Sequence, residues 1–135
     1  MVGVPGGAGP ARWRPVAWAA LVLALAAQLV GLYSPATPGP EGVPGLDKVG
    51  HLLAFAVPAA LAWALRARWL VLLLVGHALV AELVQHTMVP GRAAEVGDAV
   101  ANLVGIGLGV LLAHVLVRRR HDVGMPSVVD LEGRG

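Results

Sequence analysis

Residues 16–33 read VAWAALVLALAAQLVGLY, and this stretch contains no charged side chain. A helix needs about 20 predominantly apolar residues to cross the hydrocarbon core of a bilayer. The stretch therefore has the length and composition of a membrane-spanning helix. The alternative is a secretory signal peptide, which needs a cleavage site of small residues that Tyr33-Ser34-Pro35 does not provide. We therefore expect the helix to be retained.

Three further apolar runs follow at residues 49–65, 69–86 and 99–117. The runs at 49–65 and 69–86 are short, so their polar ends should reach the membrane interface. Because few residues separate the runs, helices that follow each other should be antiparallel. The sequence thus predicts an all-α membrane protein, an antiparallel bundle of four transmembrane helices. The expected parts are a flexible tail at 1–15, the helical domain at 16–117, and a basic, then flexible, tail at 118–135.

The composition agrees with this fold class. Of 135 residues, 57% are hydrophobic and 13% are charged, and the mean hydropathy is +0.74. An average soluble domain has about 25% charged residues, so a soluble enzyme is excluded. The net charge of +2 does not indicate a nucleic-acid partner, because the basic residues flank the apolar runs. Without cysteine there is no disulfide, thiolate nucleophile or cysteine-based metal site.

The positions of arginine and lysine predict the orientation. Seven arginines lie before the first run, between the second and third, or after the fourth: Arg12, Arg14, Arg66, Arg68, Arg118, Arg119 and Arg120. Only Lys48 and Arg92 lie near the opposite ends of the runs. Cytoplasmic loops carry an excess of basic residues, so both termini should be cytoplasmic. The four tryptophans fall near the same interface, where indole rings prefer to sit.

Polar residues gather at the expected outer ends of three runs. Ionisable side chains in a membrane cost about 2.5–3.5 kcal/mol near its centre on insertion scales, so their convergence at one depth indicates a site. The candidate binding residues are Asp47, Lys48, His51, Glu82, Gln85, Arg92, Asp98 and Asn102. Glu82 and His51 are also candidates for acid–base catalysis.

Each of these residues also has a structural interpretation. Asp47 and Asp98 can cap helix N-termini, and Lys48 and Arg92 can extend their charged groups to the interface. Glu82 needs a partner, and a purely structural ion pair would supply one. We interpret the remaining polar residues of the runs as interhelical hydrogen-bonding or packing residues: Gln28, His77 and His114.

Metal binding has weaker support in the sequence. His51, Glu82, His86 and Asp98 offer nitrogen and oxygen donors, but there is no H-E-x-x-H motif. We therefore expect no metal and no other cofactor. Gly105 and Gly109 form a G-x-x-x-G motif that lets helices approach closely. The motif can act within the chain or between copies, which leaves the oligomeric state open.

The segment from Asp47 to Gly109 resembles the VanZ-like family of small bacterial integral membrane proteins. Asp47-Lys48-Val49-Gly50-His51, followed by Phe55, is similar to that family's D-K-x-x-H-x-x-x-F opening. The rest of the pattern, E-x-x-Q … P-G-R … D-x-x-x-N-x-x-G-x-x-x-G, is matched by Glu82, Gln85, Pro90, Gly91, Arg92, Asp98, Asn102, Gly105 and Gly109. The resemblance implies a multi-pass protein of the bacterial plasma membrane with a role in the cell envelope. The founding member is associated with low-level resistance to the glycopeptide antibiotic teicoplanin.

Three hypotheses about function follow. The favoured one is that the outer polar site binds an envelope lipid, a cell-wall precursor or a glycopeptide and influences teicoplanin-type tolerance. The second is a membrane-embedded enzyme that modifies a lipid-linked envelope substrate through Glu82 and His51. The third is a structural or assembly factor in which the polar cluster only sets the helix register. We favour binding over catalysis.

Overall fold

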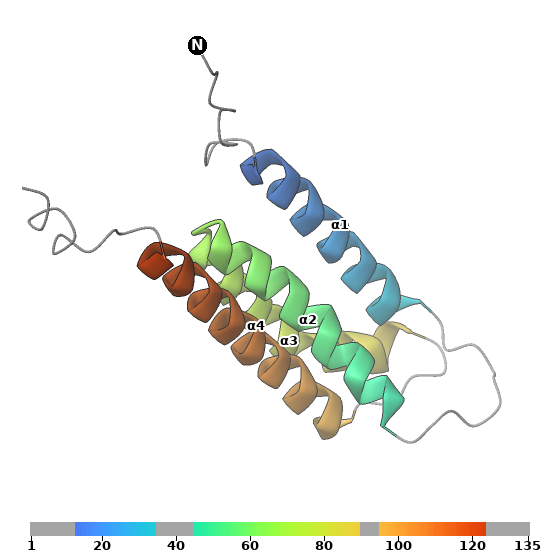
Figure 1. Ribbon diagram of the computed structural model, residues 1–135. Helices are drawn as coiled ribbons and strands as arrows, with labels where there is room; N and C mark the ends of the chain where they lie inside the picture. The colour runs from blue at the N-terminus through green and yellow to red at the C-terminus, as the bar shows by residue number, and fades with distance from the viewer. Residues whose placement is uncertain (1–12, 35–44, 90–94, 124–135) are drawn as a thin grey trace, which may run out of the picture.

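The computed structural model describes residues 13–34, 45–89 and 95–123 of the chain. All secondary structure in these residues is helical (Figure 1). The helices are α1 (Trp13–Tyr33), α2 (Leu46–Ala64), α3 (Arg68–Met88) and α4 (Val96–Val123). Each is long and apolar enough to cross a membrane, which confirms the expected all-helical class with four candidate spans. The expected terminal tails and the proline-rich residues 35–44 lie largely outside the described part.

Each helix begins before the apolar run that predicted it, α3 by one residue and the other helices by three. Pro15 lies in the first turn of α1, where a missing N–H removes no helical hydrogen bond. Gly45 precedes α2 with a φ of 83°, a left-handed conformation that glycine adopts without strain. At its other end, α4 continues through Arg118 and Arg119 to Val123. The thickness of the hydrocarbon core sets the length of the apolar run, but it does not set the length of the helix.

The distribution of side chains is the reverse of that in a soluble protein. Large apolar residues are exposed on the helices, including Leu23, Leu72 and Leu83, each more than 60% exposed. By contrast, six polar or charged residues of the described segments are buried: Gln28, His51, Glu82, Gln85, Asp98 and Asn102. A soluble monomer rarely exposes so large an apolar surface. In a bilayer the same surface faces lipid, and the helices satisfy their own backbone groups.

The closest helix pair is α2 and α4, which are not consecutive in the chain but lie side by side (Figure 1). A Cβ atom on Gly105 would meet the carbonyl oxygen of Leu52, and one on Gly109 would meet that of Ala56. Both contacts advance in the same order along the chain, so α2 and α4 run in the same direction. The G-x-x-x-G motif therefore packs within the chain.

Two apolar clusters fill the interior. One contains residues of all four helices: Leu32, Phe55, Ala59, Leu74, Ala78 and Ile106. The other contains Leu21, Ala62, Leu65 and Ala67. The Tyr33 hydroxyl and His77 Nε2 share a hydrogen bond of 2.7 Å between α1 and α3, which confirms the interhelical role expected for His77.

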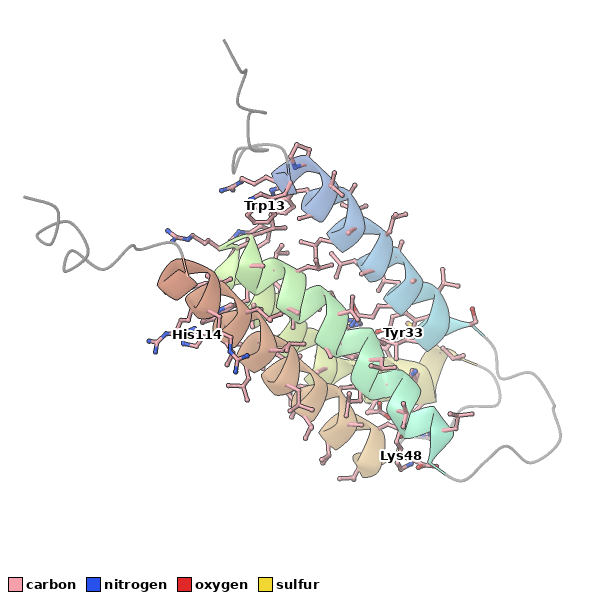
Figure 2. All side chains as sticks on the ribbon, in the orientation of Figure 1. Trp13, Tyr33, Lys48 and His114 are labelled. Carbon is pink, nitrogen blue, oxygen red and sulfur yellow. The ribbon has the colours of Figure 1, made fainter. Side chains whose placement is uncertain are left out.

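Figure 2 shows Trp13 and His114 towards one end of the molecule, and Tyr33 and Lys48 towards the other. We call the latter the Lys48 end. It is formed by the last residues of α1 and α3 and the first residues of α2 and α4, as the contacts described next show. The candidate site lies there.

Candidate functional site at the Lys48 end

Lys48 forms the outer, more exposed part of the site. Its Nζ lies 2.9 Å from Glu95 Oε2, 3.3 Å from Asp98 Oδ1 and 3.4 Å from Asp47 Oδ2. The Asp98 side chain is 12% exposed, whereas those of Asp47 and Glu95 are more than half exposed. Gly97 leaves room for the lysine, because a Cβ there would lie 2.9 Å from Lys48 Cε. Lys48 thus joins the start of α2 to the start of α4.

His51 lies one turn deeper on α2 and is buried. Its Nδ1 is 3.1 Å from Asn102 Oδ1 on α4, and an amide oxygen only accepts hydrogen bonds. Nδ1 therefore carries the proton and donates. The other ring nitrogen, Nε2, faces Asp98 Oδ2 at 3.5 Å. Asn102 is completely buried, and its contact with His51 depends on the close approach of α2 and α4.

Glu82 belongs to a third helix, α3, and lies beside His51 and Asp98. Its side chain is buried, and its Oε2 accepts a hydrogen bond of 3.3 Å from the Glu95 backbone N–H. Its Oε1 is buried and has no hydrogen-bond partner among the residues that the structure describes. One donor atom each from His51, Glu82 and Asp98 lies within 4.8 Å of the other two. Residues from α2, α3 and α4 therefore converge on one point.

The remaining three candidates do not join this cluster in the described part of the structure. Gln85 is buried, and its Nε2 donates a hydrogen bond of 2.7 Å to the Leu32 carbonyl oxygen, which joins the ends of α3 and α1. His86 is exposed and does not belong to the groups of described residues that could share a metal ion. Glu82 and His86 are one turn apart, but only Glu82 enters the interior. Arg92 lies outside the described residues.

The structure also shows whether Asp47 and Asp98 occupy the N-cap positions of their helices. The N-cap residue of α2 is Gly45, so Asp47 lies inside the first turn instead of at the cap. Asp98 likewise lies inside the first turn of α4, and its carboxylate faces Lys48 and His51. Both carboxylates suit the positive end of a helix dipole, but the geometry of Asp98 is that of a member of the charged cluster.

Sequence reasoning missed Glu95, which contacts Lys48 through its side chain and Glu82 through its backbone. Its spacing of three residues from Asp98 was a usable signal, because residues three apart share a helix face. It lies four residues before the apolar run at 99–117, whereas Asp98 directly precedes that run. The interhelical bond expected for Gln28 is not seen from its amide nitrogen, which is buried without a partner among the described residues.

A cavity of about 540 Å³ lies between α1 and α2, beside the charged cluster. Its polar lining consists of Asp47, His51 and Gln28. The rest of the lining is apolar or small, and includes Ala24, Ala27, Leu32, Leu53, Ala54, Val57 and Pro58. Its volume is within the range of about 300–1,000 Å³ typical of small-molecule sites. His51 therefore borders both the cavity and the charged cluster.

A second cavity, of about 620 Å³, lies at the opposite end of the molecule. Its lining is basic and includes Arg66, Arg68, Arg118 and His114. The Arg68 guanidinium lies 5.1 Å from the ring centroid of Trp63, and His114 packs edge-on against the same ring. Among the described residues, this end is therefore basic, whereas carboxylates outnumber cations in the cluster at the Lys48 end.

In the described part of the Lys48 end, four carboxylates face one lysine and one histidine. The carboxylates are those of Asp47, Glu82, Glu95 and Asp98. Such a set favours a bound cation or a ligand that donates hydrogen bonds. Comparison with known protein families, with curated proteins and with solved structures finds no match to this chain. The chemistry of the site therefore has to follow from its own residues.

Proposed function

We propose that the chain is a multi-pass, VanZ-like protein of the bacterial plasma membrane that binds an amphiphilic envelope molecule between α1 and α2. The observation that carries this proposal is the cavity itself, which joins a polar end at Gln28, Asp47 and His51 to apolar walls. An amphiphile has the same division into a polar head and a hydrocarbon chain. The sequence resemblance over residues 47–109 supports an envelope role.

Gln28 supports a ligand with a hydrogen-bond acceptor. Its amide nitrogen is buried and has no partner among the described residues, and the residue lines the cavity. Leaving a buried donor unpaired costs about 1–3 kcal/mol. An uncharged carbonyl or hydroxyl oxygen of a bound molecule would accept this hydrogen bond and remove that cost.

The apolar walls support a hydrocarbon chain. On α2 the lining extends from Asp47 to Pro58, which corresponds to roughly 16 Å along a helix axis at about 1.5 Å per residue. This is about half of a hydrocarbon core roughly 30 Å thick. An envelope lipid, a lipid-linked cell-wall precursor and an acylated glycopeptide such as teicoplanin share this chemistry, and we propose this class as the ligand.

The basic cavity supports one orientation of the chain in the membrane. Arg66, Arg68 and Arg118 gather at the end opposite Lys48, and basic residues favour the cytoplasmic side. We therefore propose that both termini are cytoplasmic, that consecutive helices are antiparallel, and that the Lys48 end faces outward. In that position the site meets the outer leaflet, where envelope precursors and glycopeptides are found.

The ligand proposal is tested by photo-crosslinking in nanodiscs with probes that carry a diazirine on the hydrocarbon chain. Separate arms use a phospholipid, a prenyl-linked precursor and an acylated glycopeptide. Ala27→Phe fills the cavity and Gln28→Leu removes its amide donor, so both should reduce labelling of α1 and α2 at least five-fold for the true ligand. Leu79→Phe, on the exposed surface of α3, is the matched control. Equal labelling of all four proteins would overturn the proposal.

One observation favours a second candidate, a lipid-modifying enzyme. His51 Nε2 faces Asp98, and the buried Glu82 Oε1 has no partner among the described residues, so two groups of the kind used in acid–base catalysis lie close together beside the cavity. Lipid and precursor profiles from null and overexpressing cells, compared by mass spectrometry, would test this. Unchanged profiles would exclude the enzyme. If every site variant lost membrane abundance, a structural role would be supported instead.

A further inference from the structure

The protonation pattern of His51 leaves one ring nitrogen without a proton when the imidazole is neutral. Nδ1 donates to Asn102 Oδ1 at 3.1 Å, so in the neutral ring Nε2 holds a lone pair. That lone pair faces Asp98 Oδ2 at 3.5 Å. Two acceptors facing each other repel, and the contact becomes favourable when a proton or a metal cation lies between them.

Glu82 places a second carboxylate at the same point. It is nine-tenths buried, and its Oε1 has no hydrogen-bond partner among the described residues. Lys48 neutralises the opposite side of the cluster, because it contacts Asp98 through Oδ1, whereas Oδ2 is directed to His51. No contact between Lys48 and Glu82 occurs among the hydrogen bonds and ion pairs of the described residues. A cation bound in the inner part of the cluster would therefore be separate from Lys48.

We propose that His51, Glu82 and Asp98 bind one divalent transition-metal ion through His51 Nε2 and one oxygen of each carboxylate. The three donor atoms lie within 4.8 Å of one another. Donors on a single ion, bonded at about 2.0–2.2 Å, lie at most about 4.4 Å apart. Small side-chain rotations therefore close the site. This inference reverses the expectation from sequence, and it goes beyond ligand binding in the cavity without depending on it.

The donor set indicates the class of ion. Imidazole nitrogen suits zinc and iron, and carboxylate oxygen suits manganese as well. Three protein ligands leave at least one coordination position open, as in catalytic zinc sites. Asn102 is a positioning residue here, because it orients the imidazole and sets its tautomer. Partners of this kind typically contribute about 10–100-fold to metal affinity.

The test uses the full chain, purified in detergent through a tag without histidine and treated with a chelator. After dialysis against micromolar Zn²⁺, Mn²⁺ or Co²⁺, elemental analysis should find about one ion per chain for at least one metal. The Co²⁺ form should show visible absorption bands of a site with nitrogen and oxygen ligands. Glu82→Gln and His51→Ala should weaken binding at least ten-fold, and Asn102→Leu should weaken it about 10–100-fold.

Two controls separate the site from adventitious binding. His86→Ala removes an exposed imidazole one turn from Glu82, and His114→Ala removes one at the opposite end; both should bind like the wild type. Circular dichroism and size-exclusion chromatography report whether each variant folds. If Glu82→Gln did not fold, the wild-type stoichiometry and Co²⁺ spectrum would still decide. The proposal is overturned by less than roughly a tenth of an ion per wild-type chain, or by equal binding in all variants.

The metal and the cavity can be tested independently. Ala27→Phe should lose amphiphile labelling but keep the metal, because Ala27 belongs to α1 and is not one of the three ligands. Metal occupancy is measured without any added amphiphile. Failure of one proposal therefore does not imply failure of the other.

Discussion

The side-chain oxygen of Asn102 lies 3.1 Å from His51 Nδ1, and this buried pair connects α4 to α2 beside the charged cluster. Next to it along α4, Gly105 and Gly109 pack against the backbone carbonyls of Leu52 and Ala56. The polar contact and the glycine contacts share one helix interface. The close approach of the two backbones therefore positions the histidine of the candidate site.

Gly105→Ala should destabilise the protein by about 1–3 kcal/mol, the usual range for an overpacked interior. The added Cβ would meet the Leu52 carbonyl oxygen, which is backbone and cannot rotate away. Gly107→Ala is the matched control, since nothing lies within 4 Å of a Cβ there. Unfolding in a denaturing detergent titration measures both. Equal stability of the two variants would contradict the packing of α4 on α2.

Lys48→Gln should lower the melting temperature by roughly 2–6 °C, because three carboxylates then lose their shared ammonium partner. Lys48→Arg keeps the charge and should recover most of the loss. Since these ion pairs are partly exposed, salt near 1 M should reduce the difference between wild type and Lys48→Gln. A difference that did not change with salt would argue against an electrostatic role.

Tyr33→Phe should cost about 0.5–1.5 kcal/mol, the net contribution of a typical hydrogen bond. The substitution removes the hydroxyl that bonds to His77 at 2.7 Å and leaves the ring in place. In a His77→Phe background, the same substitution should cost almost nothing. A double-mutant cycle on unfolding free energies measures this coupling, and additive effects would show that the bond contributes no stability.

The proposed orientation is tested with reporter fusions. Alkaline phosphatase fused after Gly135 should be inactive and a green fluorescent protein at the same position should fluoresce, because both report a cytoplasmic C-terminus. Alkaline phosphatase inserted at Pro40 should be active. An active phosphatase at Gly135 would reverse the orientation and place the Lys48 end in the cytoplasm.

Most of the fold could be predicted from the sequence, because membrane thickness constrains the length of an apolar run. The four runs predicted the four helices, with differences only at their ends. Every helix begins before its apolar run, by three residues at α1, α2 and α4 and by one at α3, since polar first turns such as Asp47-Lys48 interrupt the apolar pattern without interrupting the helix. Glu95, which immediately precedes α4 and lies further from the apolar run than Asp98, is the residue that this pattern overlooks.

Less of the candidate site could be predicted from the sequence. Helical spacing placed Glu82, Gln85 and His86 on one side of α3, but it could not tell which of them would enter the interior. The structure buries Glu82 and Gln85 and exposes His86. It also leaves Gln28 without a partner for its amide nitrogen among the described residues, where an interhelical bond was expected. These outcomes depend on where the neighbouring helices lie.

The sequence by itself determined the class of protein, the four candidate spans and the depth at which the ionisable residues gather. These properties follow from composition and from distance along the chain. Only the tertiary structure decided that α2 pairs most closely with α4, that His51, Glu82 and Asp98 meet at one point, and that a cavity separates α1 from α2. The physical reason is that periodicity defines the face of a helix, whereas contact depends on which other helix that face meets. Here Gly105 and Gly109 decide it, because they let two backbones approach where larger residues would hold them apart.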